Sequence, residues 1–175
     1  MKKTLILLLV LLLVTTLWGC EIGQSITDDP VNFYYPWSDL EAMMKQNPHC
    51  TVVGSELHEI SGNRDSLAYV LSLYFLGPQD SALTSPFPKN TALLSVQEQA
   101  GRLTLTLSSN FSQLKGIDLT IACTCLAKTC LDLTDADSIY IRSEVENPQD
   151  SVSFTITRKN LLLSDTQPET IPAAE

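Results

Sequence analysis

The chain has five cysteines, and thiols can bind metal, pair as disulfides or carry another group. Three of them form the run C-T-C-x₄-C in a predicted helix at 118–131. Residues two apart on a helix point in different directions, so Cys123 and Cys125 would not converge on one metal ion. Cys123 and Cys130 fall on the apolar face, where we expect them to pack in the core. A disulfide, such as Cys50 with Cys125, and a metal site are the alternatives.

The histidines and aspartates give weaker signals. His58-Glu59 lacks the second histidine of a zinc-protease helix and falls in a predicted strand, so we expect His58 to be solvated. Asp132, Asp135 and Asp137 lack the glycine and the distal glutamate of a calcium loop, and we expect a solvated turn. We therefore predict no catalytic residue, no metal site, no cofactor and no enzymatic activity.

An aromatic cluster at Tyr34, Tyr35 and Trp37 is a further candidate for binding. Such a cluster can form a platform for carbohydrate or peptide. More often it caps a core at the end of a sheet, and we favour that interpretation. The sequence does not identify the residues that bind a partner.

The beginning of the chain predicts a targeting segment. Lys2 and Lys3 precede an uncharged apolar run at 4–17, and the run closes in Leu-Trp-Gly-Cys at 17–20. The run is shorter than the roughly 20 apolar residues of a membrane-spanning helix. Its end resembles a bacterial lipoprotein signal, with an apolar residue, a small residue and then an obligatory cysteine. Trp18 is unusual for this motif, which leaves an uncleaved membrane helix as the alternative.

The resemblance implies that Cys20 carries a diacylglyceryl group and becomes the new N-terminus after cleavage. Two acyl chains hold a folded domain stably on a membrane, whereas one binds only marginally. We therefore predict a lipid-anchored protein, modified with palmitate-type chains, at the extracytoplasmic face of the cell membrane.

The charge excludes a class of partner. Loss of Lys2 and Lys3 with the signal would change the formal net charge from −9 to −11. Binding of DNA or RNA needs a basic face that displaces counterions from phosphates, so we expect no nucleic-acid partner. An acidic domain is also repelled by anionic lipid.

Helical and strand periods alternate along the chain. The apolar residues of 67–75 recur at i, i+3, i+4, i+7 and i+8, with Asp65 in the first turn and Gly77-Pro78 as the stop. Ser38 and Glu41 have the spacing of a capping box for a short helix within 36–48, where Leu40, Met43 and Met44 share a face. The predicted strands are 31–35, 51–60, 91–97, 102–107, 138–145 and 151–157, the last two joined by a turn at 146–150.

In the strand at 102–107, Leu103, Leu105 and Leu107 alternate with threonines, which is typical of a half-buried strand. A hairpin near Ala100-Gly101 precedes this strand. The whole set favours an α+β fold: a two-layer sandwich, with a mostly antiparallel sheet and two main helices packed on one face.

The middle of the chain resembles the GerMN domain of bacterial sporulation and spore-germination lipoproteins. The features of this resemblance are a helix that ends at Gly77-Pro78, a proline-rich loop, the strand with Ser95-Val96, and Ser108 close to Phe111. The helix and apolar strand of LTIACTCLAKTCLDLTDADSIYIRSE also fit. Two features depart from the family pattern: the short helix within 36–48 and the turn without glycine at 146–150. The resemblance therefore predicts the edges of the domain less specifically than its centre.

The resemblance implies a non-catalytic module that assists assembly of envelope complexes in sporulation or germination, in a Gram-positive host, with envelope or sporulation proteins as partners. The alternative is a surface lipoprotein that binds peptidoglycan or a small ligand. The predicted organisation is a signal at 1–19, a tether at 20–30, a GerMN-like domain at 31–160 and a disordered tail at 161–175.

Overall fold

The computed structural model describes residues 30–145 and 151–161. The predictions that lie outside these residues concern the signal at 1–19, Cys20, the turn at 146–150, and all but one residue each of the tether at 20–30 and the tail at 161–175.

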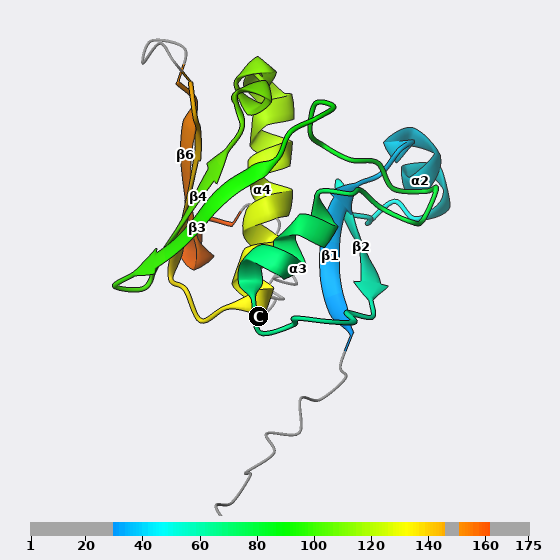
Figure 1. Ribbon diagram of the computed structural model, residues 1–175. Helices are drawn as coiled ribbons and strands as arrows, with labels where there is room; N and C mark the ends of the chain where they lie inside the picture. Colours follow the sequence, from blue (N-terminus) through cyan, green and yellow to red (C-terminus); the bar gives the residue numbers. More distant parts are fainter. Residues whose placement is uncertain (1–29, 146–150, 162–175) are drawn as a thin grey trace, which may run out of the picture.

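A four-stranded sheet forms one side of the molecule (Figure 1). Its order is β3 (Leu93–Gln99), β4 (Arg102–Leu107), β5 (Ser138–Ser143) and β6 (Ser153–Thr157). β4 and β5 are parallel, whereas the other two pairs are antiparallel. The parallel pair requires a long crossover, which α4 (Gly116–Leu133) supplies.

The inner face of this sheet is apolar. Leu103, Leu105 and Leu107 of β4 are fully buried. Ile139 and Ile141, which pair with Leu103 and Leu105 across the parallel ladder, are fully buried as well. This confirms the alternation that the sequence predicts for the strand at 102–107, and buried residues alternate in β5 as well.

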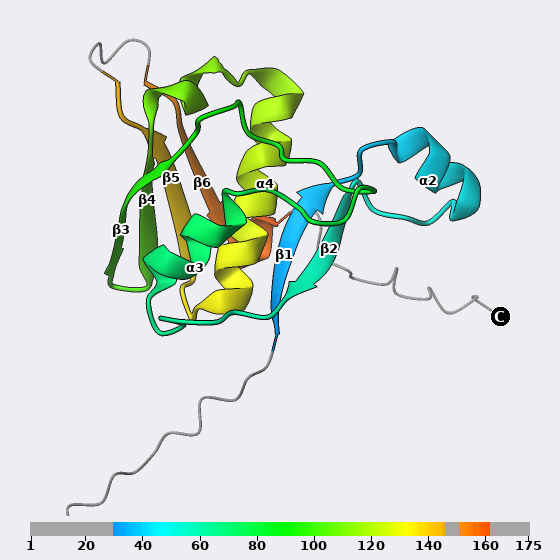
Figure 2. The same ribbon diagram turned by 45° about the vertical axis from the view of Figure 1, so that its right-hand side comes forward.

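A second sheet lies on the far side of α4 (Figures 1 and 2). β1 (Val31–Pro36) and β2 (Val53–His58) form this antiparallel ribbon. α4 contacts β5 and β6 on one side and β1 on the other. Because α4 is covered on two sides, Cys125 is fully buried together with Cys123 and Cys130.

α3 (Leu67–Tyr74) lies against β3. Its N-cap is Ser66, whose hydroxyl accepts a hydrogen bond from the Tyr69 N–H at 3.3 Å. The prediction that Asp65 lies in the first turn is therefore wrong, because the helix begins after it. The predicted stop is confirmed, since the helix has ended when the chain reaches Gly77, at a positive φ of 93°.

α2 (Leu40–Gln46) projects beside the ribbon (Figure 2). Its N-cap is Asp39, whose carboxylate accepts a hydrogen bond from a backbone N–H of the first turn at 2.9 Å. The predicted capping box of Ser38 with Glu41 is wrong, because the Ser38 hydroxyl donates to the Ala82 carbonyl at 3.0 Å. No residue of α2 is buried, so its predicted apolar face does not join the core.

The predicted fold class is confirmed: the fold is mixed α+β, its strand pairs are mostly antiparallel, and α3 and α4 pack on one face of the main sheet. The separation of β1 and β2 into a ribbon of their own is the feature that the sequence did not predict. This ribbon adds a layer outside α4.

Candidate functional site

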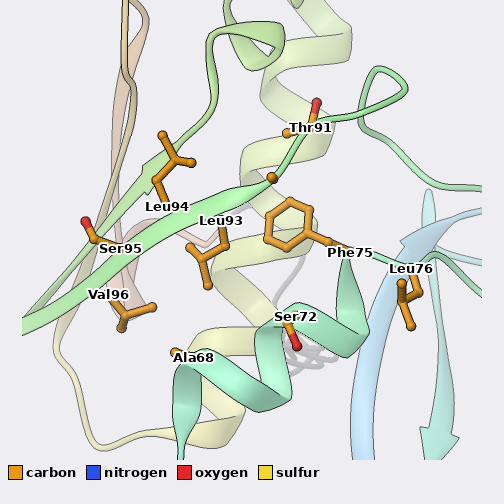
Figure 3. A pocket seen from close by; sticks show the side chains of 10 residues that line it. Ala68, Ser72, Phe75, Leu76, Thr91, Leu93, Leu94, Ser95 and Val96 are labelled. Atoms are coloured by element: carbon orange, nitrogen blue, oxygen red, sulfur yellow. The ribbon is translucent and has the colours of Figure 1, made fainter.

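An apolar groove lies between α3 and β3, with a volume of about 340 Å³ (Figure 3). β3 is an outer strand of the four-stranded sheet, so one of its edges faces away from β4. Leu93 and Val96 of the strand lie toward the helix, and Phe75 and Ser72 line the opposite wall. The groove therefore combines an apolar floor with a strand edge.

Two leucines at the groove are exposed. Leu76, just after α3, is 82% exposed, and Leu94 is 48% exposed. Leu94 lies at a β-bulge, because the pairing with β4 shifts between Leu93 and Ser95. The sequence analysis did not predict this site. The adjacent leucines Leu93 and Leu94 interrupt the alternation of the strand, so they could have indicated an exposed apolar side chain there.

The ribbon carries a second cavity, of about 300 Å³, whose lining includes Tyr34, Trp37, Ser55 and Lys128. Tyr34 and Trp37 belong to the aromatic cluster that the sequence singled out. Tyr35, the third member, lies in the core instead and donates a hydrogen bond to the Tyr74 carbonyl at 2.8 Å. Tyr34 and Trp37 thus line a cavity, whereas Tyr35 packs in the core. The favoured interpretation, in which the aromatic residues cap a core, therefore applies to Tyr35.

The side chains of Glu56 and His58 of β2 lie in hydrogen-bonding contact, and each is only 11% exposed. The His58 ring also packs on Phe33, with the ring centroids 4.5 Å apart. The prediction that His58 is solvated is therefore wrong. Strand alternation places His58 on the face that carries Phe33, which turns toward the core.

The Glu56 carboxylate also accepts hydrogen bonds from the backbone N–H groups of Gln79, at 3.0 Å, and Asp80, at 2.9 Å. Burial by itself raises the pKa of Glu56. The hydrogen bonds from Asp80, His58 and Gln79 outweigh burial and hold that pKa below its usual value. Glu56 thus fastens the loop after α3 to the ribbon.

The cysteines of α4 behave as core residues. Burial raises the pKa of the Cys123 and Cys125 thiols to about 12 and that of Cys130 further. Cys50 is half-buried, and all four described cysteines are free thiols, so the alternative disulfide between Cys50 and Cys125 does not form. Core packing, the favoured prediction, is confirmed.

Asp132, Asp135 and Asp137 are exposed at the end of α4 and in the turn to β5, as predicted. Among the residues that the structure describes, no group of three or more histidines, cysteines and acids is placed to hold a metal ion. Within the same residues, no helix has both the length and the apolar character needed to cross a membrane.

Comparison with known proteins points to one family. The model of the Germane family, described as "Sporulation and spore germination", matches residues 32–147. No curated protein matches the chain. A solved structure, "Tandem GerMN domains of the sporulation protein GerM from Bacillus subtilis", is similar at a TM-score of 0.48 and 17% sequence identity. That similarity covers 71% of this chain and 42% of the solved chain, so the protein spans less than half the length of that structure.

Proposed function

The chain belongs to the Germane family of sporulation and spore germination, and from this premise we propose that it is a lipid-anchored interaction module. It sits at the extracytoplasmic face of the cell membrane, attached through a diacylglyceryl group on Cys20. There it assists the assembly of envelope protein complexes in sporulation or germination.

The groove between α3 and β3 is the observation that supports an interaction role. Leu94 exposes apolar surface on the outer strand β3, and Leu76 exposes apolar surface just after α3, at the other end of the groove. An extended segment of a partner can add to such an edge through backbone hydrogen bonds, while alternate apolar side chains enter the groove. We therefore take the occupant to be an extended, apolar segment of another envelope protein.

The proposed role is non-catalytic. His58 and Glu56, which have the chemistry of a general acid and base, are hydrogen-bonded to each other and have little exposure. Glu56 also accepts two backbone hydrogen bonds from the loop after α3. Both side chains are thus engaged in contacts that stabilise the ribbon.

Charged variants test the groove. Leu76→Glu and Leu94→Glu place a carboxylate on exposed apolar surface, so they should leave folding intact but disfavour docking. We expect either variant to lower the frequency of sporulation or germination in the native cell at least about tenfold. Ile117→Glu, at a site that is 70% exposed at the start of α4, is the matched control.

A photo-crosslinker at position 94 should trap one envelope protein, and Leu76→Glu should abolish that product. The same crosslinker at position 117 should not trap this protein. Normal sporulation and germination of both groove variants would refute the docking role.

The intact mass of protein extracted from native membranes tests the anchor. A mass equal to residues 20–175 plus a diacylglyceryl group supports attachment at Cys20, and Cys20→Ala should release the domain from the membrane fraction. The mass of the complete chain without lipid would refute anchoring by lipid. The groove experiments would remain valid in that case.

A further inference from the structure

The outer edge of β3 contains a short segment whose backbone is free to accept another strand. A two-residue turn joins β3 to β4, and Gln99 and Arg102 form the pair that flanks this turn. In such a hairpin, hydrogen-bonded pairs alternate with non-bonded pairs, and the alternation starts from a bonded flanking pair. The N–H and C=O groups of Gln97 therefore point toward β4, whereas those of Val96 and Glu98 point away from it. Neither of these two residues has a backbone hydrogen bond to any other described part of the chain.

Val96 and Glu98 place two different side chains on one face of this edge. They pair with Leu105 and Leu103, which are buried on the inner face of the sheet, so alternation turns both toward the side that α3 covers. Val96 lines the groove, as Ala68 of α3 does (Figure 3). Glu98 is exposed and lies beyond the residues that line the groove. Along the free edge, an apolar position is thus followed two residues later by an acidic one.

The Glu98 carboxylate is available to a partner. The salt bridges between described residues join Lys45 to Glu41 and His58 to Glu56, and neither of them uses Glu98. A strand that adds to the edge would bring one of its side chains directly opposite this carboxylate. Opposite charges in such a cross-strand position stabilise a strand pair, whereas like charges destabilise it.

A second copy of β3 is a poor occupant of this edge. If the free backbone groups of two copies paired antiparallel about a twofold axis, each Glu98 would face Glu98, Val96 or Leu94 of the other copy. The first register opposes two carboxylates, and the other two set a carboxylate against an apolar side chain. An inward-facing charge on an edge strand is a common protection against self-pairing. The charge therefore favours a different chain with a basic residue at this position.

We propose that Glu98 selects the segment that docks at the groove: an extended segment with an apolar residue opposite Val96 and a lysine or arginine opposite Glu98. The inference rests on the docking role proposed above and specifies the sequence pattern of the partner. If the segment adds antiparallel to β3, the pattern reads basic-x-apolar. If it adds parallel, the pattern reads apolar-x-basic.

The test is a titration of the full chain, purified from membranes in detergent, with synthetic peptides and an NMR readout. Two peptides carry Lys-Thr-Val and Val-Thr-Lys between identical threonine-rich flanks, and two more have glutamate in place of lysine. We expect one lysine peptide to bind with a Kd at least about fivefold below that of its glutamate counterpart. Added salt should reduce this difference, because the pair is near the surface.

Amide exchange shows whether the peptide adds as a strand. The N–H groups of Val96 and Glu98 point away from β4, so the bound peptide should slow their exchange with solvent. The Gln97 N–H already points toward β4, and its exchange should change least. The lysine peptide that gives this pattern identifies the direction of the added strand.

A charge reversal tests the role of Glu98 itself. Glu98→Lys should invert the preference, so that the glutamate peptide binds more tightly than the lysine peptide. Glu144→Lys makes the same change of charge at an exposed position just after β5 and should keep the wild-type preference. An inverted preference requires a folded edge, so it cannot result from loss of the fold.

Four outcomes would overturn the proposal: no binding of either lysine peptide, equal affinity for lysine and glutamate peptides, unchanged exchange at Val96 and Glu98, and an unchanged preference in Glu98→Lys. The photo-crosslinker at position 94 separates these from a failure of the docking role. If Leu76→Glu abolishes the crosslinked product and Glu98→Lys leaves its yield unchanged, the groove docks a partner that Glu98 does not select. If no product forms in the wild type, the docking role fails as well.

Discussion

Glu56 connects three parts of the molecule through one carboxylate. It pairs with His58 on its own strand and accepts hydrogen bonds from the Gln79 and Asp80 N–H groups beyond α3. These donors hold its pKa below the usual value despite burial. A lowered pKa in the folded state means that the ionised form stabilises the fold above the unfolded-state pKa. That stabilisation is lost as pH falls through the folded-state pKa.

The first prediction follows from this linkage. Glu56→Gln should lower the free energy of unfolding at pH 7 by about 1–3 kcal/mol, because hydrogen bonds to a charged acceptor are replaced by weaker ones. The loss of wild-type stability below about pH 4.5 should be smaller in the variant. Urea unfolding between pH 3 and pH 7 measures both effects. Glu59→Gln, at an exposed position, is the control, and an unchanged pH dependence in Glu56→Gln would contradict the assignment.

The second prediction concerns the thiols. Burial raises the pKa of Cys123 and Cys125 to about 12, so their thiolate fraction at pH 8 is very small. Of the four described cysteines, iodoacetamide should modify only Cys50 in the folded protein and all four after unfolding in urea. Peptide masses identify the modified sites. Rapid modification of Cys125 in the folded state would show that α4 is not covered by the ribbon.

Among the elements, the β3–β4 hairpin shows how two residues set a register. Ala100 and Gly101 both have positive φ, of 50° and 74°. Such angles are typical of a tight hairpin turn, whose twist matches that of the strands. They cost an alanine about 1–2 kcal/mol, whereas glycine adopts them readily.

The third prediction uses the two turn positions as a matched pair. Gly101→Ala should lower the free energy of unfolding by about 1–2 kcal/mol, because it forces a positive φ on a side chain and places a Cβ 2.8 Å from the Asp137 carboxylate. Ala100→Gly should be neutral or stabilise by up to about 1 kcal/mol. Thermal unfolding measures both, and equal effects of the two substitutions would contradict the turn geometry.

At the scale of the whole molecule, α4 holds the two sheets together. Beside its apolar contacts, it binds the backbone of β1 directly: the Tyr34 N–H donates to the Thr129 hydroxyl at 3.1 Å. The Tyr74 hydroxyl of α3 donates to the Tyr34 carbonyl at 3.0 Å. Burial keeps the pKa of Tyr74 far above its usual value, so it remains a neutral donor. The ribbon thus depends on side chains of both helices.

The fourth prediction tests this dependence. Thr129→Val should lower the free energy of unfolding by about 1–3 kcal/mol, because it removes the hydroxyl that accepts a hydrogen bond from a backbone N–H of β1. Hydrogen exchange should become faster in β1 and β2 than in the four-stranded sheet. Thr124→Val is a control on the same helix, since that buried threonine donates to the Thr120 carbonyl one turn before it. Equal acceleration in both sheets would show that the ribbon does not open separately.

The sequence by itself determined the elements of this protein and the pattern of its core. Local signals carry this information: the period of apolar side chains on α3, the alternation on β4, and the glycines that end a helix or turn a hairpin. Each depends on residues close together in the chain, so no distant contact is needed to interpret it. The family resemblance, which the match to residues 32–147 bears out, also depends on the order of these local features.

The tertiary structure alone decided where the side chains with chemistry lie. His58 and Glu56 are held together because alternation in β2 turns both toward the core and the loop at 79–80 closes over Glu56. Lys128 reaches Tyr34 across 94 positions of sequence because α4 packs against β1. The groove between α3 and β3 likewise joins segments that are distant in the chain. Side-chain type is encoded locally, but the neighbours of a side chain are set by packing between elements, which no local period specifies.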